Sequence, residues 1–195
     1  APSDRINLGY IGTGKQVHGL LDGLGRLPET MVIAAADVDK QKLSFFIENA
    51  NQVNANKSKI AVAGYPDYRQ LLERKDIDAI VIASPDHWHA LHVIDSAKAG
   101  KDIYCEKPLS LTIDEGRHMV NAATKNKRIL QTGSMQRSQH NFRHAVEMII
   151  NGYIGKVQTI NVAVGSPVKQ CDLPTKPTPD YLDWDMWVRP SLYRG

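Results

Sequence analysis

Two alternating periodicities constrain the fold of this chain more than any other feature of its sequence. Short apolar runs of the length of buried strands alternate with stretches whose apolar residues recur three and four positions apart. The expected strands are Ile6–Ile11, Met31–Ala36, Ile60–Ala63, Ile77–Ala83, Asp102–Cys105 and Arg128–Thr132. The expected helices are Val17–Leu27, Gln41–Ala50, Tyr68–Glu73, His89–Ala99, Ile113–Ala123 and Phe142–Ile150. Because parallel strands need long crossovers, the alternation predicts an α/β fold with a doubly wound parallel sheet.

Residues at the ends of three predicted helices support these boundaries. Gly100 follows one helix and can adopt the left-handed conformation that closes it. Thr112 with Glu115 forms the pattern of a capping box at the start of the next. Ser138, ahead of the Phe142 segment, is a third candidate cap.

The pattern changes after Gly155. Residues 156–164 alternate apolar and polar, which predicts a strand of a different, antiparallel sheet. Residues 167–194 have no clear period and read as a long loop with one aromatic segment, Tyr181–Trp187. We therefore expect a Rossmann domain over residues 1–155. Residues 156–195 would be the first strand and loop of a second, α+β domain that is largely missing, as in a truncated or proteolysed chain.

Charge and hydropathy point away from two classes of partner. The net charge is +3 with scattered basic residues, and the densest cluster, residues 125–128, fits an exposed helix end. We therefore expect no nucleic-acid partner. No apolar run approaches the roughly 20 residues that span a bilayer, so no transmembrane segment is expected.

The cysteines and the first residue bear on the compartment. Cys105 and Cys171 do not make a disulfide framework, and Cys105 ends an apolar run as a small buried residue would. Cleaved signal peptides leave mature chains that begin with small residues such as Ala1, so export is favoured over a cytoplasmic location.

A glycine-rich turn follows the first predicted strand. Gly12 permits a tight turn, and Gly14 lets the backbone approach a pyrophosphate at the N-terminus of the following helix. Val17 occupies the position of the third glycine in the dinucleotide-binding pattern, with Gly19 two residues later. The strand-to-helix context favours a dinucleotide site over an ordinary glycine-rich turn.

A carboxylate ends the second predicted strand. Asp37 lies 23 residues beyond Gly14, where an acidic side chain can bind the hydroxyls of an adenosine ribose and repel a 2′-phosphate. Asp37 therefore favours NAD over NADP. The alternative role for a carboxylate here is a helix N-cap, which Asp39 could serve equally well.

Histidines cluster after the third buried strand, in Ser84-Pro-Asp-His-Trp-His89 and at His92. The carboxyl ends of strands in doubly wound sheets lie beside the ligand, so this segment should border the cofactor. The spacing of His87, His89 and His92 is poor for one metal ion, and His140–His144 lacks the glutamate of the helical zinc motif. We expect no metal site.

The next strand ends in Glu106-Lys107-Pro108. A lysine beside a bound nicotinamide could hydrogen-bond a substrate hydroxyl. Burial and the positive oxidised ring would lower its pKa, so that the neutral amine is available to accept a proton. Taken alone, the tripeptide is equally compatible with a surface turn.

Taken together, these motifs resemble the Gfo/Idh/MocA oxidoreductase family, named for glucose–fructose oxidoreductase and inositol dehydrogenase. The resemblance covers residues 6 to about 165. It rests on the ordered set Gly12-Thr-Gly14, Asp37, Ser84-Pro-Asp-His-Trp-His89, Ala99-Gly-Lys101, Glu106-Lys-Pro108, Gln131-Thr-Gly-Ser-Met-Gln-Arg137 and Gly152-Tyr-Ile-Gly-Lys156. Residues 182–187 also look like a branch of the family that is often exported from bacteria.

The resemblance implies a Rossmann domain followed by an open antiparallel-sheet domain that binds substrate and forms oligomer contacts. It implies that Lys107 is the catalytic lysine and that the peptide bond before Pro108 is cis. The predicted cofactor-binding residues are Gly12, Thr13, Gly14, Lys15, Gln16, Asp37, Ser84, Pro85, His89, Glu106, Lys107, Gln136 and Arg137. Gln136 and Arg137 would border the nicotinamide or the substrate.

Two departures from the family pattern qualify these implications. Val17 replaces the usual small residue of the glycine loop, and the family's second-domain acid/base pair lies beyond the end of this chain. The function predicted first is NAD-dependent oxidation of a sugar, inositol or related polyol by a full-length homo-oligomer. An NAD-dependent glycosidase of the same fold and a non-catalytic dinucleotide-binding module are the alternatives.

Overall fold

The computed structural model describes residues 5–166 and 174–190. These residues form two compact units. One comprises the described residues up to Gly133 together with those from Thr178 onward, and the other comprises Ser134–Pro177. The first unit thus ends at Gly133, before the domain boundary predicted at residue 155, and it includes the described tail from Thr178 onward.

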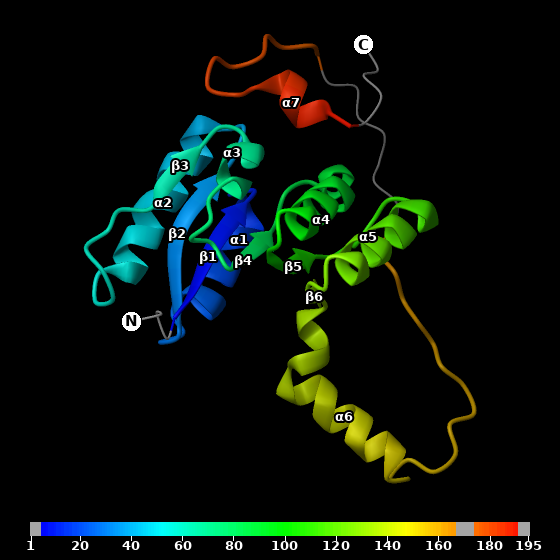
Figure 1. Ribbon diagram of the computed structural model, residues 1–195. Helices are drawn as coiled ribbons and strands as arrows, with labels where there is room; N and C mark the ends of the chain where they lie inside the picture. The colour runs from blue at the N-terminus through cyan, green and yellow to red at the C-terminus, as the bar shows by residue number, and fades with distance from the viewer. Residues whose placement is uncertain (1–4, 167–173, 191–195) are drawn as a thin grey trace. The chain divides into compact units, whose positions relative to one another are not determined.

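The first unit is built on a six-stranded, all-parallel sheet with the order β3-β2-β1-β4-β5-β6 (Figure 1). The strands are β1 (Ile6–Ile11), β2 (Thr30–Ala36), β3 (Ala63–Tyr65), β4 (Ala79–Ile82), β5 (Asp102–Glu106) and β6 (Leu130–Gly133). The strand order reverses between β1 and β4, so a crevice opens there at the carboxyl ends of the strands. The predicted doubly wound α/β fold is confirmed.

Helices cover both faces of the sheet. They are α1 (Lys15–Leu20) continuing into the π-helical turn η1 (Leu21–Gly25), α2 (Lys40–Asn54), α3 (Tyr68–Leu72), the 3₁₀ turn η2 (Asp86–Trp88), α4 (His89–Lys98) and α5 (Ile113–Lys125). Val17 and Phe46 of α1 and α2 pack with one set of sheet residues, and Leu71, Val93 and Met119 of α3, α4 and α5 pack with the other. A parallel sheet buried on both faces explains why its strands read as continuous apolar runs.

Two of the three predicted helix-end signals are confirmed. Thr112 and Glu115 make the reciprocal bonds of a capping box at α5, and Gly100 closes α4 with φ +78°. The predicted Ser138 cap is wrong. Ser138 ends the 3₁₀ turn η3 (Met135–Ser138), and α6 (His140–Ile150) begins after Gln139 without a side-chain cap.

Two predicted strands need correction. The weak strand predicted over Ile60–Ala63 begins instead at Ala63, because pairing with β2 extends only over Ala34–Ala36. Residues 156–164 form no strand in the described structure, and apolar side chains such as Ile160 and Val162 are exposed. A strand needs a neighbour for its N–H and C=O groups, and no described segment pairs with this one.

The tail supplies one further helix, α7 (Trp184–Val188), capped by the Asp183 side chain. This helix overlaps the aromatic segment Tyr181–Trp187 and lies at the carboxyl end of the sheet (Figure 1). Residues 167–173, including Cys171, and 191–194 of the predicted loop lie outside the described residues. Among the described helices, none combines the length and apolarity needed to cross a membrane.

Candidate dinucleotide-binding site

A cavity of about 270 Å³ lies at the carboxyl ends of the strands, around the point where the strand order reverses. Its walls come from the glycine turn after β1, the end of β2, the segment after β4, and the tail helix α7. The lining residues are Ile11, Gly12, Gly14, Lys15, Gln16, Ala36, Asp37, Val38, Lys42, Pro66, Tyr68, Ala83, Ser84, Pro85, Trp88, His92, Met186 and Trp187.

The glycine turn is shaped by two glycines with different surroundings. Gly12 has φ +85°, and a Cβ there would lie 2.4 Å from the backbone nitrogen of Ser84. Gly14 caps α1, and a Cβ built on it would meet no atom within 4 Å. The turn is therefore pressed against the β4 end at Gly12 and open at Gly14, where a phosphate can approach the helix N-terminus. This cradle fits a pyrophosphate.

The carboxylate of Asp37 lines the cavity and accepts hydrogen bonds from two of the segments around it. One of its oxygens accepts hydrogen bonds from the backbone N–H and the hydroxyl of Thr13, at 2.6 and 2.8 Å. The other accepts from the backbone N–H of Asp39 at 2.8 Å. Asp37 thus couples the glycine turn to the end of β2, and each carboxylate oxygen can accept further hydrogen bonds.

Asp39 serves the capping role that the sequence left open. Its side chain accepts from the backbone N–H groups of Gln41 and Lys42 at the start of α2, at 3.0 and 3.1 Å. The Lys42 ammonium lies 3.1 Å from the second oxygen of Asp39. These interactions lower the pKa of Asp39 against the opposing effect of its burial. The two nearby carboxylates therefore divide the roles, with Asp39 capping α2 and Asp37 facing the cavity.

The three histidines after β4 each make separate contacts. His87 Nε2 bonds the carbonyl of Trp187 at 2.8 Å, and His92 Nδ1 bonds the Ser84 hydroxyl at 2.9 Å. His89 is 1% exposed and joins the carbonyls of Ser84 and Pro108, at 2.9 and 2.6 Å. His89 thus ties the end of β4 to the end of β5 without lining the cavity. Within the described residues, no three metal-binding side chains converge on one point.

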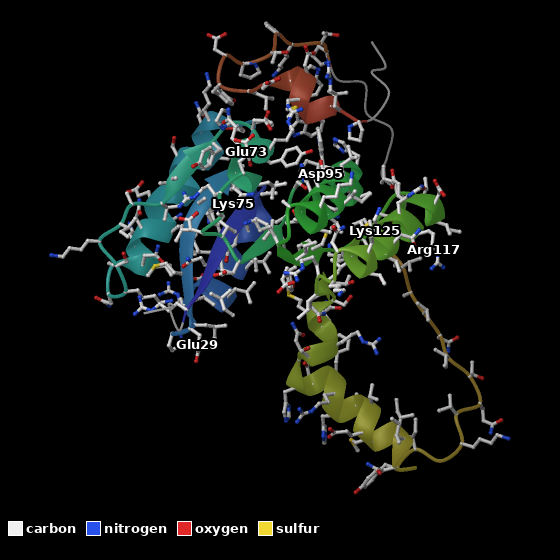
Figure 2. All side chains as sticks on the ribbon, viewed as in Figure 1. Glu29, Glu73, Lys75, Asp95, Arg117 and Lys125 are labelled. Atoms are coloured by element: carbon white, nitrogen blue, oxygen red, sulfur yellow. The ribbon has the colours of Figure 1, made fainter. Side chains whose placement is uncertain are left out.

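His92 belongs to a compact aromatic group that lines the cavity. Its ring stacks on Trp88 at 4.9 Å and meets the edge of Tyr68 at 4.3 Å. The Tyr68 hydroxyl donates to Asp95 on α4 at 2.7 Å, and Asp95 is labelled in Figure 2. Burial, aided by the nearby His89 and His87, lowers the pKa of His92 to about 3. His92 is therefore a neutral hydrogen-bonding partner that orients the Ser84 hydroxyl at the cavity.

The low pKa of His92 predicts a pH-dependent stability. The unfolded ring ionises near pH 6.5, whereas the folded ring stays neutral down to about 3. Between these values the unfolded state binds the extra proton, so the free energy of unfolding should fall by about 1.4 kcal/mol per pH unit as the pH decreases. Urea unfolding at several pH values should show this slope. In His92→Gln the slope should be smaller by about 1.4 kcal/mol per pH unit, the contribution of one proton. An unchanged slope in that variant would contradict the assignment.

Glu106 and Lys107 stand at the end of β5 with contrasting exposure. Glu106 is 3% exposed, accepts from Gln16 Nε2 at 3.3 Å, and also accepts from the Lys107 backbone N–H. The Lys107 side chain is exposed, so the expected burial of this lysine is not observed in this chain. The Lys107–Pro108 peptide bond is cis, as the family resemblance implied.

The structure brings together most of the residues predicted to bind the cofactor. Seven line the cavity: Gly12, Gly14, Lys15, Gln16, Asp37, Ser84 and Pro85. Thr13, His89 and Glu106 lie behind these as buried hydrogen-bonding partners. Gln136 and Arg137 belong to the second unit, where both are exposed in η3.

Several lining residues escaped the sequence analysis. Lys42, Pro66 and Tyr68 follow β2 and β3, and Met186 and Trp187 come from the tail. The aromatic run at residues 181–187 was the one signal that could have pointed to the tail, but nothing in its sequence indicates which strands it contacts.

Fold and cavity define a class of protein: a Rossmann domain with a glycine turn after its first strand, a carboxylate after its second strand and a cleft at the topological switch point. The family model described as "Oxidoreductase family, NAD-binding Rossmann fold" matches residues 6–134. The chain belongs to this family, Gfo/Idh/MocA.

Individual relatives agree with this membership. Myo-inositol 2-dehydrogenase of Thermotoga maritima is 32% identical over 83% of this chain and 44% of its own length. A glycosyl hydrolase family 109 protein of Shewanella pealeana is 29% identical over 76% of this chain and 32% of its own length. The solved structure of Lactobacillus casei myo-inositol dehydrogenase with NAD(H) and myo-inositol aligns with TM-score 0.65 and 28% identity, over 77% of this chain and 43% of that one. The chain thus spans less than half the length of these relatives.

Proposed function

We propose that this chain is the cofactor-binding part of an NAD-dependent oxidoreductase that acts on a sugar, inositol or related polyol. The observation that carries the proposal is the cavity itself, in which Asp37 lies beside an open glycine turn. The likeness to myo-inositol dehydrogenases supports the substrate class. When bound, the nicotinamide cofactor supplies a hydride acceptor for a carbinol carbon.

The charges around the ribose position favour NAD over NADP. The carboxylate of Asp37 can accept hydrogen bonds from ribose hydroxyls and would repel a 2′-phosphate. Lys42 and Lys15 both line the cavity, and the ammonium of Lys42 is paired with Asp39 at 3.1 Å. The charge of Lys42, which could attract a 2′-phosphate, is thus partly neutralised.

The chain's own residues divide the remaining tasks. Gly14 and the start of α1 would hold the pyrophosphate. The Ser84 hydroxyl, which is hydrogen-bonded to His92, would orient the nicotinamide ribose. Lys107, at the carboxyl end of β5, would accept a hydrogen bond from the substrate hydroxyl or take its proton. Export of the protein and its assembly into a homo-oligomer remain predictions of the sequence.

An NAD-dependent glycosidase is the second candidate. The similarity to glycosyl hydrolase family 109 proteins, at 29% identity, favours it specifically. Such an enzyme regenerates its cofactor, so it would release a glycoside's leaving group without net NADH formation. Net reduction of NAD by the full-length protein with a free polyol therefore separates the two candidates.

The catalytic assignment is tested on the full-length protein with NAD and a panel of free polyols. Lys107→Met should lower kcat by about 10²- to 10⁴-fold, as expected for loss of a general acid–base group, and leave the Kd for NAD nearly unchanged. Lys98→Ala, at an exposed lysine on α4, is the matched control and should retain full turnover. Undiminished turnover in Lys107→Met would overturn the role of Lys107.

A further inference from the structure

The tail segment 181–188 crosses the end of the sheet and is anchored by its backbone on the β2 side. The N–H of Lys40 donates to the carbonyl of Tyr181 at 2.9 Å, and the N–H of Asp183 donates to the carbonyl of Val38 at 3.0 Å. Leu182 forms an antiparallel bridge with Asp39. The segment thus pairs through its backbone with residues 38–40, which follow β2.

A second anchor holds the same segment to the β4 side. The carbonyl of Trp187 accepts two hydrogen bonds, from Nε2 of His87 at 2.8 Å and from the indole N–H of Trp88 at 3.1 Å. The Trp187 ring stacks on Trp184 at 5.0 Å and meets His87 edge-on. With both ends fixed, α7 spans the distance between the β2 and β4 sides of the cavity.

Between the two anchors, Met186 lies at the cavity wall. It lines the same cavity as Asp37, Val38 and Pro66, and it packs against the apolar core on the α3 and α4 face. Methionine presents a polarizable thioether that makes favourable contacts with aromatic rings.

The connectivity of a dinucleotide shows what would reach this wall. A ribose lies between the pyrophosphate and the adenine. If the pyrophosphate is at Gly14 and the ribose at Asp37, the adenine must lie on the far side of Asp37 from Gly14. Val38 and Pro66 line the cavity just after β2 and β3, on the side of Asp37 away from β1. Met186 lines the same cavity, in a segment whose Asp183 N–H donates to the carbonyl of Val38. The hydrogen bonds of the tail described above go to residues 38–40, His87 and Trp88, and a Cβ at Gly14 would meet no atom within 4 Å.

We propose that segment 181–188 is the outer wall of an adenine subsite and that Met186 contacts the base. This assignment rests on the proposed function and adds to it a cofactor-binding residue from outside the Rossmann strands and crossovers. The tail would therefore raise affinity through the adenine half of the cofactor, independently of the nicotinamide half.

The test is calorimetric titration of the chain with NAD, with 5′-AMP and with nicotinamide mononucleotide. Met186→Ala should weaken the binding of NAD and of 5′-AMP by the same factor, about tenfold for the loss of an apolar contact that the base buries. The affinity for nicotinamide mononucleotide should be unchanged. Met186→Leu, which keeps the apolar volume, should restore most of the affinity. Met148→Ala, on α6 of the other unit, is the matched control and should bind like the parent chain.

Two results would overturn this assignment alone. Unchanged 5′-AMP binding in Met186→Ala, with a parent chain that binds NAD, would mean that Met186 does not contact the base. Tighter NAD binding in Met186→Ala would mean that the tail obstructs the cavity. Failure of the parent chain to bind NAD or NADP is a different outcome, because it would contradict the proposed function itself.

Discussion

Asp37→Ala is expected to weaken NAD binding by roughly 30-fold. Hydrogen bonds from two ribose hydroxyls to a charged carboxylate contribute about 2 kcal/mol in net terms, which corresponds to that factor. The substitution also removes the acceptor for the backbone N–H and hydroxyl of Thr13, at 2.6 and 2.8 Å, so the glycine turn loses its tie to β2. Isothermal titration calorimetry measures the change directly.

Charge and geometry at this position can be separated with a second variant. Asp37→Ser keeps a hydroxyl near Thr13 but removes the negative charge that opposes a 2′-phosphate. Asp37→Ala removes the same charge, but only the serine hydroxyl can donate a hydrogen bond to a 2′-phosphate, so Asp37→Ser should narrow the preference for NAD over NADP more than Asp37→Ala does. Asp22→Ala, at an exposed ion pair with Arg26, is the control and should change neither affinity. Parent-like NAD affinity in Asp37→Ala would refute the ribose role.

Gly12→Ala is expected to lower the free energy of unfolding by about 3 kcal/mol. A Cβ at this residue would lie 2.4 Å from the nitrogen and 2.5 Å from the Cα of Ser84, both backbone atoms that cannot rotate away. The φ of +85° adds about 1–2 kcal/mol for any residue other than glycine, and forced overpacking adds a similar amount. Urea unfolding followed by circular dichroism measures the loss.

Gly14→Ala is the matched control for Gly12→Ala because the same methyl group enters open space. It should lower the free energy of unfolding by no more than about 1 kcal/mol, the cost of alanine in place of glycine at a helix N-cap. Its methyl group would instead project where the pyrophosphate approaches α1, so NAD binding should weaken while the fold persists. Equal stability losses in the two variants would show that close packing at Gly12 is not what requires glycine there.

The sheet could be predicted from the sequence because burial on both faces gives each strand a continuous apolar run. β1 matches its predicted bounds, Ile6–Ile11, and the ends of the other strands shift by a few residues. The strand predicted over residues 156–164 is absent from the described structure, for a reason that cannot be read from the alternating pattern. Alternation shows that a segment can pair, but a strand forms only where another segment meets its backbone groups.

The residues of the candidate site also divide into those that could be predicted from the sequence and those that could not. Gly12, Gly14 and Asp37 could be found because their roles depend on local backbone geometry and on distance along one strand–turn–helix–strand unit. The place of Met186 at the cavity could not, because it depends on hydrogen bonds between the tail and residues 38–40, more than a hundred residues earlier in the sequence. The exposure of Lys107 likewise depends on what packs around β5, which its tripeptide motif does not specify.

The central claim is that the cavity at the β1–β4 switch point binds the dinucleotide, and titration of this chain with NAD and NADP tests it most directly. The account predicts saturable one-to-one binding of NAD, with NADP weaker. Absence of binding to either cofactor, by a chain that unfolds cooperatively and is therefore folded, would contradict it.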